Sequence, residues 1–585
     1  MEQNQSNQKV KIWNSILILL SVIGLIVCIP VLFPQVRRMI MNLITQAMGR
    51  ELGMYQSWFD YLLSLAMGGI CTILFLDYCF LTNSGRALVK KVKQEIKDCL
   101  SEINFRSFLK PVLIIFAIYF LGIFTIIRAN FLYNDDVVWS IMGNRDWYNW
   151  SRYVIMFLSY FIQPEIHMTD ISPIPQLLAI LVLACSSVLL VYITGNKKVT
   201  VMRLLASIPL GLSHFFLEGL SYKFASIYGA FAILVSIIPF LFVNRKKAFI
   251  FCSVLSLLII CMTNQIAVNI YMLIVVILCF QYWITGEKKK KEIFSFLGIA
   301  AFAFCFALLF FKFFLMRSYN EMESTYTSTA IYPIASIIPG ILSNIKNYAL
   351  IVNHDLGIVW KVGIVLVLLF FIVQSTARSV HGKISSLLVS VLVVGLSFIL
   401  SYGLYLLLSV PLYEPRALFG FGALLAILCI MVVSDFKKVA TITVLALNWC
   451  FFVFAFSYGN ALADQGRYLE FRRGILFQDL NVLYSNRNSE YLTFQIKNSI
   501  DFTPSVKNIA KNDPIIERLV PKRLTKINCW DQYYFPDYMA LDYISSYPSS
   551  KDYLDFSTLN LPVVLDSYYH TIQSDGNRVL ITLKH

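Results

Sequence analysis

Long apolar blocks recur along this chain and restrict its fold more than any other feature. Each block runs about 17 to 25 residues, the length that an α-helix needs to cross about 30 Å of hydrocarbon. A membrane β-barrel would instead show alternating segments of about 10 residues. Of the 585 residues, 58% are hydrophobic and 14% are charged, whereas soluble domains are about one quarter charged. The sequence therefore predicts an α-helical polytopic membrane protein.

Hydropathy predicts about thirteen transmembrane helices. The first block is long and lacks a small-residue cleavage site, which indicates a retained helix rather than a signal peptide. The predicted spans are 13–33, 60–82, 111–127, 174–194, 203–218, 224–243, 248–263, 266–285, 293–315, 358–376, 385–407, 417–433 and 439–457.

The basic residues predict the orientation of these helices. Lys and Arg concentrate in cytoplasmic loops of membrane proteins. Here they fall in alternate short connections, namely 86–110, 197–198, 245–247, 288–291 and 437–438. This pattern places the N-terminus in the cytoplasm and everything after Tyr458 outside. It also explains the net charge of +15, which therefore does not indicate a nucleic-acid partner. One external segment, 34–58, holds three arginines and is interpreted as an interfacial helix.

The chain divides into three predicted parts. Residues 1–110 form a two-helix membrane extension with a basic cytoplasmic linker, and residues 111–457 form the main transmembrane domain. Residues 458–585 are more polar and predict a small extracytoplasmic α/β domain. The elements expected in it are helices at 461–480 and 506–519 and strands at 491–496, 563–568 and 579–584. Of the twelve cysteines only Cys529 lies there, so no disulfide framework is expected.

Two adjacent carboxylates, Asp135 and Asp136, follow the span that ends near Arg128. Charge near hydrocarbon is costly and tends to be functional. One carboxylate could act as a general base toward a hydroxyl, while the other orients it or holds a divalent cation. A solvated loop whose acids cap the next segment is the plainer explanation. The dipeptide alone does not distinguish these interpretations.

The residues after the pair have a characteristic order. Gly143, Trp147 and the dipeptide Ser151-Arg152 follow it, and Ser172-Pro173 precedes the next span. This order resembles the Gtr type II glucosyltransferases, the bacteriophage O-antigen conversion type, within the GT-C class of polytopic membrane glycosyltransferases.

Three further stretches are similar to that family, and all fall on the predicted external side. They are 215–224, with Tyr222-Lys223-Phe224 at its end, the turn 263–265 and the element Pro415-Arg416. The resemblance covers about 111 to the C-terminus. Ser151 stands where the family usually has Gly, and Asn264 replaces an aromatic residue.

The resemblance implies a GT-C-like fold and a reaction. A hexose would move from a polyprenyl-phosphate carrier, such as undecaprenyl phosphate, to a cell-surface glycan on the outer face of a bacterial cytoplasmic membrane. The acceptor would be an O-antigen, a teichoic-type polymer or another cell-wall polysaccharide. Asp135 or Asp136 would deprotonate the acceptor hydroxyl, and one displacement would invert the anomeric centre. A polyprenyl-phosphate glycosyl synthase and a flippase would supply the donor.

The remaining candidate site residues are those that could contact the donor. Arg152, Lys223 and Arg416 are the external cations available for its phosphate, although each could instead extend to lipid headgroups. Glu218 either neutralises Lys223 or lines the site. Tyr222 and Gln265 complete the predicted substrate-binding set. No metal-ligand spacing is evident, so a divalent cation would be held only by the Asp pair.

Two other functions remain open. A transporter or flippase for lipid-linked glycans would carry charges in the middle of helices or matched pairs of broken helices. The main helix charge, Lys312, lies near an outer end instead. A polysaccharide polymerase is chemically close, but its large catalytic loop usually comes late in the chain. There is no P-loop and no glycine-rich dinucleotide motif, which argues against a nucleotide-sugar donor.

Overall fold

The computed structural model describes most of the chain beyond the second predicted span. The described residues are 83–316, 330–433, 438–484, 492–525, 530–535, 541–543 and 554–584. Two predicted spans, 13–33 and 60–82, lie outside them, as do the segment 34–58 and Cys529. Contacts separate the chain into two units. The first comprises Met1–Ile103, Phe242–Leu258 and Ala301–Ser318, and the second comprises Asn104–Leu241, Ile259–Ala300 and Tyr319–His585.

In the first unit, the amphipathic helix α4 (Asn83–Ser101) carries the basic linker predicted from the sequence. The side chain of Glu95 accepts a hydrogen bond from the backbone N–H of Ala248 at 3.0 Å. Glu102 forms a 3.0 Å ion pair with Arg245. The connection 245–247 therefore meets the linker, as two segments on one side of a membrane can.

Membrane helices make up most of the described chain. Eight of its helices are long and apolar enough to cross a bilayer, and a ninth counts if one bent pair is a single span. The eight are α5 (Leu109–Ala129), α8 (Ile174–Thr194), α14 (Val268–Thr285), α15 (Lys290–Phe310), α16 (Ile337–Asp355), α17 (Ile358–Arg378), α18 (Lys383–Leu400) and α20 (Lys438–Tyr484). The shorter apolar helices are α12 (Ser226–Ile237), α13 (Lys246–Cys261) and α19 (Gly420–Val433). The protein is thus a helical membrane protein, and thirteen spans remain a prediction.

The predicted span 203–218 is not a straight helix. It consists of α9 (Val201–Ala206), α10 (Pro209–Leu212) and α11 (His214–Ser221), with a bend of 62° before α11. The bend falls at Ser213, whose backbone is extended (φ −63°, ψ 145°). Because the chain turns here, the end of α11 and the residues after it meet the loop that holds Asp136.

Helix α16 was not predicted, because its mean hydropathy of 1.2 is lower than that of the other spans. Its buried positions, Gly340, Asn344, Tyr348 and Val352, recur every four residues, which is the pattern of an amphipathic helix. Asn344 donates hydrogen bonds to the carbonyls of Leu406 and Leu408, at 3.1 and 3.0 Å. A hydropathy average cannot detect a helix whose polar residues are used internally.

Close contacts between α5 and α20 organise the second unit. The Thr125 hydroxyl donates to the carbonyl of Ala455 at 3.3 Å. At Gly459 an added Cβ would lie 2.4 Å from that same hydroxyl oxygen, so only glycine lets the two backbones approach this closely. On its other side α5 meets α8, where the Tyr119 and Ser187 hydroxyls lie 2.7 Å apart.

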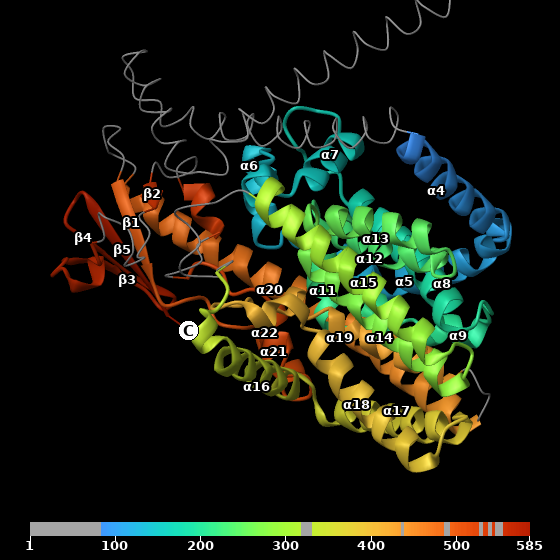
Figure 1. Ribbon diagram of the computed structural model, residues 1–585. Helices are drawn as coiled ribbons and strands as arrows, with labels where there is room; N and C mark the ends of the chain where they lie inside the picture. Colours follow the sequence, from blue (N-terminus) through green and yellow to red (C-terminus); the bar gives the residue numbers. More distant parts are fainter. Residues whose placement is uncertain are drawn as a thin grey trace, which may run out of the picture. The chain divides into compact units, whose positions relative to one another are not determined.

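Helix α20 is continuous over 47 residues, about 70 Å of helix. The sequence predicted two helices there, 439–457 and 461–480, and the structure joins them. The first half packs among membrane helices and the second half enters the C-terminal region (Figure 1). There Gln465 donates to the carbonyl of Asp501 and accepts from the N–H of Thr503. The same helix therefore serves both the membrane part and the C-terminal domain.

The C-terminal domain contains a five-stranded mixed sheet in the order β2-β1-β5-β4-β3 (Figure 1). Its strands are β1 (Leu492–Lys497), β2 (Leu541–Tyr543), β3 (Val563–Asp566), β4 (His570–Ser574) and β5 (Arg578–Leu583). Strand β1 runs parallel to β2 and β5, and the last three strands form an antiparallel meander. The predicted small α/β fold is therefore confirmed, whereas its extracytoplasmic placement remains a prediction.

Two details of this domain differ from the prediction. Strands β2 and β4 were missed, because β2 has only three residues and β4 lies between a predicted strand and the turn that leads into β5. The predicted helix 506–519 is divided into α21 (Pro504–Ala510) and α22 (Ile516–Leu519). Pro514 explains the division, since proline has no N–H to donate and disfavours a helical residue before it.

Candidate functional site

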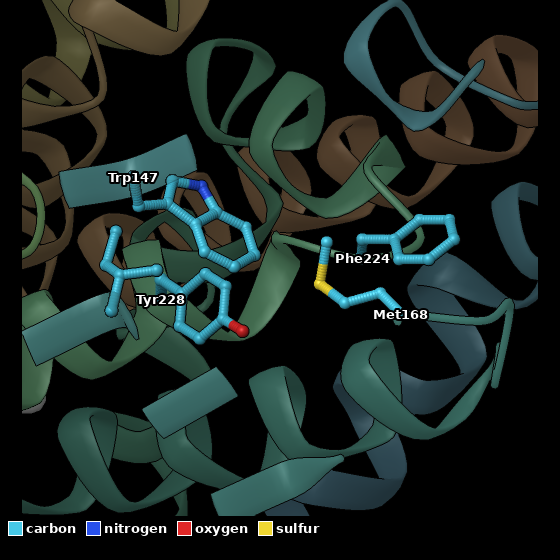
Figure 2. Packing of buried hydrophobic residues seen from close by; sticks show 5 residues of the cluster. Trp147, Met168, Phe224 and Tyr228 are labelled. Carbon is cyan, nitrogen blue, oxygen red and sulfur yellow. The ribbon is translucent and has the colours of Figure 1, made fainter. Parts of the chain in front are cut away.

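The first long loop of the second unit is a packed structure. It contains α6 (Asp135–Met142), η2 (Asp146–Trp150) and α7 (Tyr153–Ile162). Five side chains, from the loop itself and from residues 224–228, form a buried cluster: Trp147, Ile155, Met168, Phe224 and Tyr228. Figure 2 shows the Trp147 ring beside that of Tyr228, and Met168 next to Phe224. The loop is thus anchored on the segment that joins α11 to α12.

Arg145 fixes the course of this loop. Its guanidinium donates to the Ser159 hydroxyl at 3.2 Å and to the carbonyls of Gln163 and Ile166 at 2.8 and 2.5 Å. The side chain is buried and lies over the Tyr160 ring. Its hydrogen bonds connect the C-terminal end of α7 and the residues after it to the turn after α6, so we assign Arg145 to the structure of the loop.

Asp136 is fully buried at the start of α6 and connects two segments of chain. Its carboxylate accepts backbone N–H bonds from Tyr133 (3.0 Å), Lys223 (2.9 Å) and Phe224 (3.3 Å). Burial raises the pKa of Asp136 to about 7 although these three N–H groups favour its ionised form. With both oxygens engaged by the backbone, this residue positions the loop against the 223–224 segment.

Asp135 has different surroundings. Its side chain is partly exposed. Burial raises its pKa above the usual value for an aspartate, while the positive charges of Arg416 and then Arg152 lower it. Arg152 is exposed and the Arg416 side chain is 30% exposed. An accessible carboxylate thus lies within the electrostatic influence of two accessible guanidinium groups.

Arg416 is held by Glu218 and Tyr222. Its backbone N–H donates to Glu218 at 2.7 Å, and its guanidinium donates to the same carboxylate at 2.9 Å and to the Tyr222 hydroxyl. Glu218 is buried on α11. These hydrogen bonds hold the element η8 (Pro415–Ala417) against α11, the helix that follows the bend at Ser213.

Glu218 therefore neutralises Arg416 rather than Lys223. The Lys223 ammonium pairs with Asp170, and its side chain is only 6% exposed. Lys223 and Ser172 together hold the pKa of Asp170 below its usual value in spite of partial burial. Sequence reasoning missed Asp170, whose only signal was its position just before Ser172-Pro173. Binding of the donor phosphate by Lys223 remains a prediction.

A backbone hydrogen bond joins the segment that follows Arg152 to the segment that precedes Gln265. The N–H of Val154 donates to the carbonyl of Met262 at 3.2 Å, joining α7 to the turn before α14. Gln265 is exposed at that turn. Asn264 caps it by accepting from the N–H of Ile266 at 3.3 Å, a local role that no aromatic side chain could perform.

One carbonyl of the C-terminal domain accepts hydrogen bonds from two tyrosines. The hydroxyls of Tyr133 and Tyr458 both donate to the carbonyl of Leu519 at the end of α22, at 2.7 and 3.3 Å. Ser221, the last residue of α11, lies 2.8 Å from the Tyr458 hydroxyl. These tyrosines carry no motif that would identify them in the sequence, yet they join the loop, α20 and the C-terminal domain.

A family comparison decides the class of the protein. The model of the glucosyl transferase GtrII family matches residues 124–433, more than half of the chain. The chain belongs to the GtrII glucosyltransferase family.

A curated relative agrees with this assignment. An "uncharacterized 55.3 kDa protein in gtrB 5'region" of Salmonella phage P22 is 24% identical over 447 residues. That alignment covers 72% of this chain and 89% of the phage protein. No solved structure matches. The resemblance drawn from the sequence is thereby confirmed.

The GtrII match contains every predicted site residue. It excludes the N-terminal extension and the C-terminal domain. The protein is therefore a membrane glycosyltransferase of the glucosyltransferase type, with its family-matched region surrounding Asp135 and Arg416.

The Asp pair does not fit a divalent cation in this GtrII protein. Both oxygens of Asp136 face backbone N–H donors, which would oppose a metal ion at the same positions. Elsewhere in the described residues, no three His, Cys, Asp or Glu side chains gather closely enough to hold a metal. The Asp pair is therefore assigned no metal-binding role in the reaction.

Substitutions of Ser151 test how this chain accommodates serine where the family usually has glycine. It ends η2 in the left-handed region (φ 57°) and is buried. We expect Ser151→Gly to keep activity and to change the free energy of unfolding by about 1 kcal/mol or less. Ser151→Val should destabilise the protein by about 2 kcal/mol or more, because a β-branched side chain disfavours this backbone. Thermal unfolding of both variants in detergent would measure this, and equal stability of the two would contradict it.

Proposed function

We propose that this protein transfers a glucose-type hexose from a polyprenyl-phosphate carrier to a hydroxyl of a surface glycan on the extracytoplasmic side. One observation carries the proposal. The accessible carboxylate of Asp135 lies beside two accessible cations, Arg416 and Arg152, in the family-matched region. A carboxylate can take a proton from an acceptor, and guanidinium groups can bind a departing phosphate.

The reaction that fits this arrangement is a single displacement. The acceptor oxygen attacks the anomeric carbon while the bond from that carbon to the phosphate oxygen breaks. The bonding electron pair leaves with the polyprenyl phosphate, and the acceptor proton passes to Asp135. The anomeric centre is inverted, and no covalent enzyme intermediate forms.

The structure favours Asp135 over Asp136 as the base. A general base must reach its proton with a free lone pair. Asp136 is buried and receives three backbone N–H groups, whereas Asp135 is partly exposed. In the proposal Asp136 is a positioning residue that holds α6, and therefore Asp135, against the 223–224 segment.

Arg416 and Arg152 are assigned to the leaving phosphate. Arg416 is oriented by Glu218 and Tyr222, so its guanidinium needs little reordering when the donor binds. Tyr222 contacts the Arg416 guanidinium directly, and a contribution of Gln265 to substrate binding belongs to the proposal. Accessible guanidinium groups also stabilise the negative charge that grows on the phosphate during the displacement.

The surface of α7 supports a lipid-linked donor. Phe157 and Phe161 on this helix are 71% and 80% exposed. Large exposed aromatic side chains next to a membrane domain are typical of a helix lying in the bilayer interface. A carrier lipid diffusing in that leaflet would meet the loop that holds Asp135.

The donor class is directly testable. Full-length protein in lipid nanodiscs would be given either polyprenyl-phosphate glucose or UDP-glucose, and release of the carrier would be followed with and without added surface polysaccharides. We expect turnover only with the lipid-linked sugar, and an inverted anomeric configuration in the product by NMR. Consumption of UDP-glucose without turnover of the lipid-linked sugar would refute the proposal.

The pH dependence of transfer should report on Asp135. A base works only when ionised, so kcat/KM should fall as the pH falls through its pKa. Because burial raises this pKa, the fall should occur at a higher pH than for an ordinary aspartate. In Arg152→Gln the fall should move to still higher pH, because the charge of Arg152 lowers the pKa of Asp135. A pH profile unchanged by this substitution would remove Asp135 from the role of base.

A further inference from the structure

A groove with both polar and apolar walls lies beside Glu414, close to Arg416 in the sequence, and has no role in the chemistry described so far. It has a volume of about 570 Å³. Its walls come from the end of α16, the segment before η8 and helix α22 of the C-terminal domain. The polar side chains that line it are His354, Asp355, Tyr413, Glu414 and Arg518.

The groove is built from fixed groups. Asp355 is buried and pairs with Arg518, whose guanidinium also donates to the carbonyl of Tyr413. The Tyr413 hydroxyl donates to Asn344 at 3.2 Å. The His354 side chain, by contrast, is 71% exposed at the edge. The result is a preformed site with rigid walls and an accessible rim.

Aromatic stacking connects the groove to the reaction centre. The Tyr413 ring stacks on that of Tyr402 (5.5 Å, 13°), and Tyr402 stacks on Tyr405 (5.5 Å, 20°). Tyr405 is close enough to Arg152 and Arg416 for their charges to act on it. In the sequence, Glu414 lies only two residues before Arg416. A ligand in the groove would therefore contact Tyr413 and Glu414, which lead through stacked rings and through the chain toward Arg416.

The chemistry of the lining indicates which ligand fits. Two carboxylates, Asp355 and Glu414, accompany a single guanidinium, so the groove does not attract a phosphate group. Carboxylate, imidazole and guanidinium groups do, however, suit the many hydroxyls of a sugar. The volume lies within the usual range for small-molecule sites, about 300–1,000 Å³.

We infer that this groove binds the acceptor glycan, as a neutral oligosaccharide segment that runs from the C-terminal domain toward Asp135. This inference rests on the proposed function, because it assigns the acceptor side of that reaction. It also assigns the C-terminal domain a role in acceptor binding, since α22 supplies Arg518 to the groove. The donor phosphate would remain on the other side of Arg416.

The test uses full-length protein in nanodiscs and two tryptophan substitutions on α16. Leu350→Trp would fill the groove, which Leu350 lines with a 55% exposed side chain. Ser343→Trp is the matched control, because this exposed residue lies about two turns earlier on the same face and outside the groove. Binding of short linear glucans, mannans and rhamnans would be measured by saturation-transfer NMR.

We expect at least one of these saccharides to bind wild-type and Ser343→Trp protein equally, and Leu350→Trp about tenfold or more weakly. With lipid-linked glucose as donor, Leu350→Trp should raise the KM for the acceptor while carrier release to water stays unchanged. Equal binding by all three proteins, no binding of any saccharide, or displacement of the saccharide by inorganic phosphate would overturn the inference. If no lipid-linked sugar is turned over at all, the proposed function fails, and the binding measurement still decides the groove.

Discussion

Asp135→Asn should lower glycosyl transfer by about 10²–10⁴-fold, the usual contribution of a general base. The amide keeps the size of the side chain but cannot take the acceptor proton. Protein abundance and thermal stability should remain near those of the wild type, because Asp135 is partly exposed at the start of α6. The measurement is carrier release from polyprenyl-phosphate glucose by purified protein in the presence of acceptor.

Asp136→Asn is the matched control for that experiment. An amide presents an N–H₂ group where the carboxylate accepts backbone N–H bonds, so at least one of the three donors loses its partner. Each buried donor left unpaired costs about 1–3 kcal/mol. We therefore expect a lower melting temperature in this variant. A stable but inactive Asp136→Asn beside a fully active Asp135→Asn would exchange the two assignments.

Arg416→Met should have the second large effect, on both stability and turnover. It leaves the buried carboxylate of Glu218 without its cation, and breaking a buried ion pair in this way costs about 3–5 kcal/mol. The double variant Arg416→Met/Glu218→Gln should regain most of that stability, because no unpaired charge remains.

Turnover separates the two roles of Arg416. If the guanidinium binds the leaving phosphate, the double variant should stay about 10²-fold or more below the wild type although it is stable. The comparison is made by thermal unfolding and by carrier release on the same preparations. Recovery of activity together with stability would reduce Arg416 to a partner of Glu218.

The membrane helices were predictable wherever the apolar content was high. The predicted span 174–194 coincides with α8, because an unbroken apolar block has no other stable state in lipid. Helix α16 was missed, since Asn344 and the polar residues near it lower its hydropathy while serving internal contacts. The bend at Ser213 was also missed, because an extended serine between two helical segments leaves no signal in composition.

The candidate site was predictable as a set of residues and not as a set of contacts. Motif order selected Asp135, Arg152 and Arg416 as one set, and in the structure the charges of both arginines act on Asp135. The partners of the charges were not accessible in this way. Asp170 binds Lys223 across 53 positions of sequence, and Leu519 accepts from Tyr133 across 386. Pairings over such separations depend on tertiary packing, which no local pattern encodes.

The unbroken course of α20 limits how the C-terminal domain can move. A hinge needs a few residues whose backbone can change conformation, and a regular helix offers none between Lys438 and Tyr484. The C-terminal domain must therefore move together with α20 as one rigid body. A movement of the domain large enough to open the region around Asp135 would tilt the entire helix α20. It would also separate Gly459 from Thr125 at the contact between α5 and α20.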